Sequence, residues 1–196
     1  MRKILVTLAI FSGISLVTTA NAAPNYVFPI SECTVKYARV HHDYPATDIL
    51  GKKGCKFVAV TGGVVDEIRK KDTYNYKKPT GDTKGGIFVS IVGDDGVRYY
   101  GSHLQKVAAG IEIGMRVEPG TLLGYLGDSG DARGTAPHVH FGISWPTEAN
   151  IWWVRRGELY PWKYLDAWKA GKDLSPAKSV AKLRDKYGEI PPIPKK

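Results

Sequence analysis

All five histidines of this 196-residue chain lie in three short stretches, and their placement constrains the fold more than any other feature. They are His41, His42, His103, His138 and His140. A fold that joins the three stretches would gather several imidazoles at one place, together with Asp48, which follows the first pair. The sequence therefore predicts a metal site with further histidines beside it.

The last two histidines, His138 and His140, are two residues apart. On a strand, residues i and i+2 point to one face, so the two imidazoles would emerge side by side. Val139 and Phe141 would then point into a core. A pair of half-exposed strand histidines would give the same local pattern, so the functional interpretation depends on the other two stretches.

Zinc is the metal that these residue types favour. A catalytic zinc site uses three protein ligands, such as imidazoles and a carboxylate, and keeps a water in the open position. His140, Asp48 and one of His41 and His42 would make such a set, and we expect one Zn²⁺ per chain.

The motifs and their order resemble the LytM/lysostaphin-type zinc metalloendopeptidases, which cut peptide cross-links in bacterial peptidoglycan. The resemblance covers roughly Tyr37 to Ser144. It consists of five segments in the family's order, at residues 41–48, 60–65, 100–104, 114–127 and 136–141. The chain departs from the family's usual first motif, in which three residues separate His from Asp. Five residues separate His42 from Asp48, so the spacing does not decide whether His41 or His42 binds zinc.

The resemblance also implies a mechanism. Zinc would polarise a peptide carbonyl and lower the pKa of its bound water toward neutrality. His103 and His138 would flank that water, one as the base and one as the stabiliser of the oxyanion. Glu67 and Glu148 lack the HExxH context, so neither is expected to be the base.

Two other functions stay open from the sequence. One is a non-catalytic regulator or wall-binding module on the same fold, although such proteins usually lack the zinc ligands that this chain keeps. The other is a zinc amidase that cuts the bond between sugar and peptide. The order of the motifs favours the endopeptidase over the amidase.

Short apolar runs separated by Gly and Pro predict a mostly β fold with a small antiparallel barrel or sandwich core of the LytM/lysostaphin type. Residues 57–60 and 64–68 flank Gly62-Gly63 and predict one hairpin. Residues 86–92 and 97–104 predict a second hairpin. We expect this peptidase domain to span residues 23–150.

Two segments lie outside this β pattern. Residues 70–85 are polar and are expected to form a long exposed loop beside the substrate. Residues 151–196 are expected to form a Trp-rich, partly helical extension packed on the core, with helices near 161–170 and after Ser175-Pro176. A wall-binding platform made of the tryptophans is the alternative for this extension.

Cys33 and Cys55 are the only cysteines. An even pair in an exported chain predicts a disulfide, which would close a loop around the first histidine stretch. Thiolate metal ligands are the alternative, but the imidazoles and Asp48 already make a complete set.

The first 22 residues have the features of a secretory signal peptide. A basic start precedes an apolar run at 4–17, and Ala20-Asn21-Ala22 is a small-x-small cleavage signature. We therefore expect an exported, periplasmic or secreted monomer without a transmembrane segment. The signal segment carries two of the 28 Lys and Arg and none of the 19 Asp and Glu, so the net charge falls from +9 to +7 on cleavage. That charge suits an anionic cell-wall polymer such as peptidoglycan, and in an exported protein nucleic acid is not the expected partner.

Mature protein recovered from the producing cell should begin at or near Ala23, because cleavage is expected after Ala22. N-terminal sequencing or intact mass spectrometry measures this directly. Exported protein that retains Met1 would contradict the signal peptide.

Overall fold

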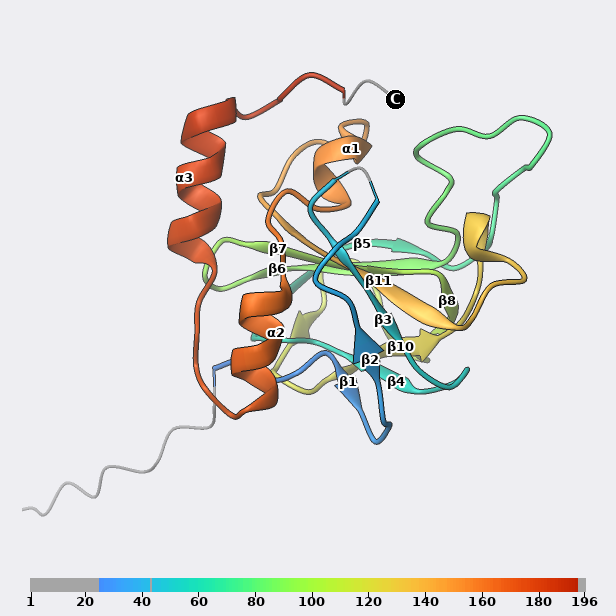
Figure 1. Cartoon of the computed structure of the whole chain (residues 1–196), viewed down its shortest axis with the longest axis horizontal. Coiled ribbons are helices and arrows are strands. Elements are labelled where there is room, and N and C mark those ends of the chain that lie inside the picture. Colours follow the sequence, from blue (N-terminus) through green and yellow to red (C-terminus); the bar gives the residue numbers. More distant parts are fainter. Residues whose placement is uncertain (1–24, 43, 194–196) are drawn as a thin grey trace, which may run out of the picture.

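A computed structural model describes residues 25–42 and 44–193. The predicted signal peptide lies outside the described residues. Strands occupy the centre of the molecule, and the two longer helices stand at one side of them (Figure 1). Among the described residues, every helix is too short or too polar to cross a lipid bilayer.

The larger of two sheets has seven strands, and each neighbouring pair is antiparallel. In spatial order they are β2 (Lys36–Tyr37), β3 (Thr47–Leu50), β11 (His138–Ser144), β7 (Arg98–Ser102), β6 (Phe88–Gly93), β5 (Gly63–Arg69) and β9 (Arg116–Val117). The central strands β11, β7 and β6 are almost entirely buried, which explains their runs of Val, Ile, Tyr and Phe.

The smaller sheet has four antiparallel strands. They are β1 (Ile30–Ser31), β4 (Lys56–Val58), β10 (Leu122–Leu126) and β8 (Leu104–Val107). Phe57 of β4 packs against Gly101 of β7, where any Cβ would collide with the phenyl ring, so the two sheets meet closely at this glycine. The mostly antiparallel β prediction is confirmed. In the part of the chain that the structure describes, the strands form two packed sheets and no closed barrel.

One of the two predicted hairpins is correct. β6 and β7 pair directly across the turn at 93–96, as predicted. The hairpin around Gly62-Gly63 is wrong, because β4 and β5 belong to different sheets. Gly63 instead lets β5 approach β6, since a Cβ at this position would collide with the backbone of Val92. The two glycines therefore mark a crossing between sheets rather than a tight turn within one.

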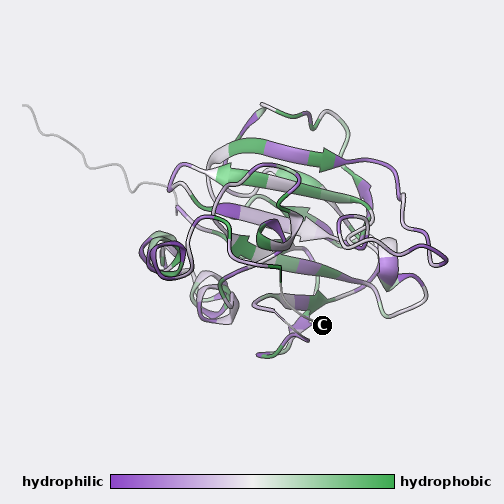
Figure 2. Ribbon diagram, turned by 90° about the horizontal axis from the view of Figure 1, so that it is seen from above, coloured by the Kyte–Doolittle hydropathy of each residue, from purple (hydrophilic) through white to green (hydrophobic). Residues whose placement is uncertain are grey.

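The C-terminal segment packs on the sheets through three helices, α1 (Trp152–Arg155), α2 (Trp162–Lys169) and α3 (Ala177–Tyr187). The expected helices correspond to α2 and α3, whereas the single turn of α1 was not predicted. Leu165, Trp168 and Val180 are buried in the same core cluster as the strands. In Figure 2, α2 and α3 appear end-on beside the sheets. The indoles of Trp145 and Trp153 are half-buried or buried, and each donates a 2.8 Å hydrogen bond to a backbone carbonyl of the tail that follows α3.

The predicted disulfide between Cys33 and Cys55 is present, and it spans 22 residues of sequence. The enclosed loop contains β2 and β3, and it carries His41 and Asp48. The bridge therefore restrains the segment that supplies two candidate metal ligands.

Replacing both cysteines by alanine should lower the free energy of unfolding by about 3 kcal/mol, because a loop of this length is freed in the unfolded chain. Urea denaturation of the oxidised wild type and of the Cys33→Ala/Cys55→Ala protein measures the difference. Reductant should destabilise the wild type by a similar amount and leave the double variant unchanged. Equal midpoints for wild type and variant would contradict the expected role of the bridge.

Candidate metal centre and active site

Sheet register brings the histidine stretches together. β11 pairs with β3 on one side, where His140 stands opposite Asp48, and with β7 on the other, where His140 stands opposite Ser102. His103 directly follows Ser102, so it lies at the same end of β7. Val139 has no exposed surface, which confirms that it points into the core, while the flanking histidines face the opposite side of β11.

His41, Asp48 and His140 form a group whose candidate ligand atoms all lie within 4.8 Å of one another. Nε2 of His41 lies 3.7 Å from Oδ1 of Asp48, and Nδ1 of His140 lies 3.2 Å from the same oxygen. The side chains of the two histidines are only 6% and 4% exposed. His42 is exposed and stands outside this group. The geometry therefore favours His41 as the first ligand, a choice that the sequence spacing left open.

Each of these two histidines has one ring nitrogen held by a backbone carbonyl. Nδ1 of His41 lies 3.2 Å from the oxygen of Tyr44, and Nε2 of His140 lies 3.0 Å from the oxygen of Arg156. A carbonyl oxygen only accepts, so these nitrogens carry the protons, and the other nitrogen of each neutral ring presents a lone pair toward Asp48. Lone pairs that converge on a carboxylate suit a bound cation. This donor set, with each outer N–H fixed by a carbonyl, fits zinc.

Burial favours the neutral form of two imidazoles of this site, those of His41 and His103. It lowers the pKa of His41 to about 4, and together with the neighbouring imidazoles it lowers the pKa of His103 to about 3. Burial alone would raise the pKa of Asp48, but the close contact with His140 and the nearby His138 and His41 outweigh this and hold the pKa below its usual range. At neutral pH His41 is therefore neutral and Asp48 is ionised, which is the protonation state that metal binding requires of an imidazole and a carboxylate.

His103 and His138 lie side by side next to this group, with ring centroids 4.9 Å apart. Nδ1 of His103 donates to the carbonyl of Ser129, and Nδ1 of His138 donates to that of Ala136, each at 2.8 Å. Nε2 of each ring is therefore left as an acceptor. His103 lies between β7 and β8 with a φ of 60°, which is uncommon for a residue other than glycine. Backbone strain of this kind occurs most often at functional sites.

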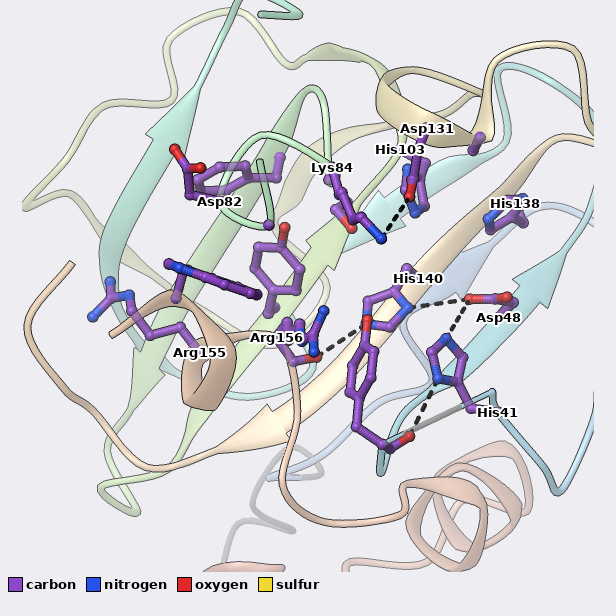
Figure 3. A pocket seen from close by; sticks show the side chains of 18 of the residues that line it. His41, Asp48, Asp82, Lys84, His103, Asp131, His138, His140, Arg155 and Arg156 are labelled. Carbon is purple, nitrogen blue, oxygen red and sulfur yellow. Dashed lines mark hydrogen bonds and ion pairs between the residues drawn. The ribbon is translucent and has the colours of Figure 1, made fainter. Parts of the chain in front are cut away.

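The three candidate ligands and the two further histidines line one cleft of about 510 Å³ (Figure 3). They are His41, Asp48, His140, His103 and His138. The polar loop at 70–85 contributes Asp82 and Lys84 to its wall, which places that loop beside the candidate substrate site as expected. The C-terminal segment contributes Trp152 and Arg156. The cleft is thus built from both the β core and the segment that follows it.

Two residues of the cleft were not identified from the sequence. The hydroxyl of Tyr44 lies 3.4 Å from Nε2 of His140, and its ring lies 3.8 Å from Cζ of Arg156. The only sequence signal for Tyr44 was its place in the insertion between the first histidines and Asp48. Arg156 follows a single helical turn, which is too short to show a periodic pattern.

A partly buried group of two histidines and one aspartate, with two further histidines in the same open cleft, is the donor set of a mononuclear metal-dependent hydrolase. The sequence profile of peptidase family M23 matches residues 42–151, which are more than half of the chain. The chain belongs to peptidase family M23.

Relatives of known structure or activity agree with this assignment. An L-Ala–D-Glu endopeptidase from Bacillus subtilis (strain 168) is 33% identical over 90 residues, which cover 43% of this chain and 26% of that protein. Lysostaphin from Staphylococcus simulans has a TM-score of 0.55 and 21% identity, covering 79% of this chain and 59% of its own. The catalytic domain of lysostaphin has a TM-score of 0.50 and 20% identity, covering 67% of this chain and 92% of that domain. The chain thus spans about a quarter of the Bacillus relative, and the two structures confirm the predicted LytM/lysostaphin-type fold.

Metal content should separate the candidate ligands from the other histidines. His41→Ala, Asp48→Ala and His140→Ala each remove one of three ligands, so zinc should fall from about one per chain to near zero after dialysis against a weak chelator. His42→Ala and His103→Ala should keep their zinc and serve as controls. Mass spectrometry of the metal, with circular dichroism to verify folding, measures the outcome.

Full zinc content in both Asp48→Ala and His140→Ala would contradict the site. Loss of zinc in His42→Ala, with zinc retained in His41→Ala, would reverse the assignment of the first ligand.

Proposed function

We propose that this chain is an exported zinc metalloendopeptidase that hydrolyses peptide bonds in the cross-linked peptides of bacterial peptidoglycan. The observation that carries the proposal is the arrangement of the candidate ligands and two further histidines in one cleft. Membership of peptidase family M23 supports a peptide bond as the target. The similarity to an L-Ala–D-Glu endopeptidase supports a wall peptide as the substrate.

Zinc held by His41, Asp48 and His140 would supply a Lewis acid and a water with a lowered pKa. Proton transfer and oxyanion stabilisation would be carried out by His103 and His138. Their Nδ1 atoms donate to backbone carbonyls, which leaves Nε2 of each ring to act in the cleft. One of them accepts the proton of the attacking water, and the other, when protonated, donates a hydrogen bond to the developing oxyanion. The carbonyls of Ser129 and Ala136 keep both rings in the tautomer that this requires.

Export is part of the proposal. The Cys33–Cys55 disulfide supports it, because such bridges persist in the periplasm and outside the cell and are rare in the cytosol. The net charge of +7 expected for the mature chain supports association with an anionic wall polymer.

Zinc-loaded mature protein should open peptide cross-links in purified sacculi while sugar–peptide bonds stay intact. The assay is digestion followed by chromatography and mass spectrometry of the fragments. We expect loss of cross-linked dimers and gain of monomers that still carry their sugars. His103→Ala is the matched control, because it should keep zinc and lose at least about 100-fold in rate if this imidazole acts in proton transfer or oxyanion stabilisation.

The same fragments distinguish the alternatives. Free peptides together with bare glycan would identify an amidase. Unchanged sacculi of several wall chemistries, with zinc bound, would identify a regulator or binding module.

A further inference from the structure

We propose that Arg156 forms an anion subsite that selects substrates with a free carboxylate close to the scissile peptide bond. The inference deepens the proposed function, since it concerns the substrate of the same cleft. It implies that acidic wall peptides are cleaved in preference to neutral ones, such as amidated peptides or oligoglycine bridges.

Arg156 is placed at the metal centre by its own backbone. Its carbonyl oxygen accepts the Nε2 proton of His140 at 3.0 Å, and its side chain lines the cleft together with Asp48 and both catalytic candidates. Figure 3 shows Arg156 directly beside His140. The guanidinium Cζ lies 3.8 Å from the centroid of the Tyr44 ring, which lies 5.5 Å from the ring centroid of His140. An extended peptide advances about 3.5 Å per residue, so a group bound by this guanidinium would lie within roughly two residues of the bond at the metal.

Aromatic rings hold the guanidinium in place. Its Cζ lies 3.8 Å from the ring centroid of Tyr44 and 4.9 Å from that of Trp152. Trp152 is in turn fixed against Gly81 of the 70–85 loop, where any Cβ would collide with the indole. Stacking orients the guanidinium without using its N–H groups, and the two terminal nitrogens stay available as a planar, bidentate donor. Among the described residues, no side-chain nitrogen of Arg156 has a protein hydrogen-bond partner, and its Nε is buried.

Two other arginines of the cleft, unlike Arg156, have their guanidinium groups in ion pairs. Arg98 and Arg155 also line the cleft, but both are ion-paired with Asp66 and Glu67 at 2.6–3.0 Å. Asp66 and Glu67 are therefore already engaged by these two arginines. In contrast to these two arginines, Arg156 forms no ion pair with any carboxylate of the described residues.

Glu158, two residues further along the chain, is not a substitute for that ligand. It lines a separate apolar cavity with Leu159, Tyr160 and Leu183. Burial raises the pKa of Glu158 to about 7 in spite of the positive charge of Arg156. The ion pairs among the described residues accordingly do not include one between Arg156 and Glu158.

A carboxylate fits the subsite better than other anions do. The guanidinium fork matches the two oxygens of a carboxylate, and the adjoining rings favour a flat group. Peptide carboxylates are present in wall peptides that carry an acidic residue, and they disappear when that residue is amidated.

The decisive experiment compares two cross-linked wall peptides that differ in one respect. In one, the free carboxylates within two residues of the cleaved bond are intact, and in the other they are primary amides. For the zinc-loaded wild type, kcat/KM should be about 10- to 100-fold higher for the carboxylate form, since a hydrogen bond to a charged group has that effect. Arg156→Gln should reduce this ratio to about one, mainly by slowing the carboxylate form, and Arg156→Lys should leave an intermediate ratio because it keeps only the charge.

Two controls remove one positive charge elsewhere. Lys84→Gln acts in the same cleft, where Lys84 lies 3.9 Å from Asp131, and Arg184→Gln acts on the exposed face of α3. Both should keep most of the preference for the carboxylate form. Loss of the preference in Lys84→Gln, with its retention in Arg156→Gln, would assign the subsite to the lysine and overturn the proposal.

Binding supplies a readout that does not depend on turnover. In a His103→Ala background, calorimetry should show about 10-fold or more tighter binding of the carboxylate peptide than of its amide, and Arg156→Gln should abolish the difference. Equal binding and equal cleavage of both peptides by protein with Arg156 intact would overturn the subsite even if Arg156→Gln failed to fold. Absence of cleavage, with the binding preference intact, would count against the proposed function and leave the subsite standing.

Discussion

The orientation of His140, one of the candidate metal ligands, depends on an arginine–carboxylate network in the wall of the cleft. Arg98 has no exposed surface, and its guanidinium donates to Asp66 at 2.6 Å, to Glu67 at 3.0 Å and to the backbone carbonyl of Arg155. Arg155 donates to the same two carboxylates. Buried charges of this kind are costly to separate, so α1 is held in one position on the central strands. The next carbonyl along the chain is the one that holds His140, so the network fixes the ring orientation of that candidate ligand.

The sequence could predict what short-range patterns determine. The alternation of histidines and apolar residues at 138–141 predicted a strand with Val139 and Phe141 facing the core. The helical spacing of apolar residues in the C-terminal segment predicted α2 and α3. The sequence could not predict the arginine–carboxylate network, because regular strand alternation would place Asp66 and Glu67 on opposite faces of the sheet. A bulge in β5 between Val65 and Glu67 breaks this alternation, and both carboxylates reach the same arginines. Such a bulge follows from pairing with β6 and has no local sequence signal.

The candidate site was predictable as a set of residue types but not as a set of roles. The histidines and Asp48 could be grouped by chemistry, whereas the choice between His41 and His42 depends on three-dimensional placement. Sheet register decides which side chain faces Asp48, and the carbonyls that fix the tautomers come from turns whose conformation the sequence does not specify. The prediction of a hairpin at Gly62-Gly63 was wrong for a related reason, since a glycine pair can allow either a tight turn or a close approach of two strands.

The departure from the family's usual His–Asp spacing connects the metal centre with substrate recognition. The inserted residues bring the carbonyl of Tyr44 to Nδ1 of His41, so the longer segment itself supplies the group that orients its ligand. The same tyrosine places its ring against Arg156, which the C-terminal segment delivers from the other side of the cleft. We therefore infer that the insertion and the C-terminal segment act together, one orienting the metal ligand and both building the wall that the substrate meets.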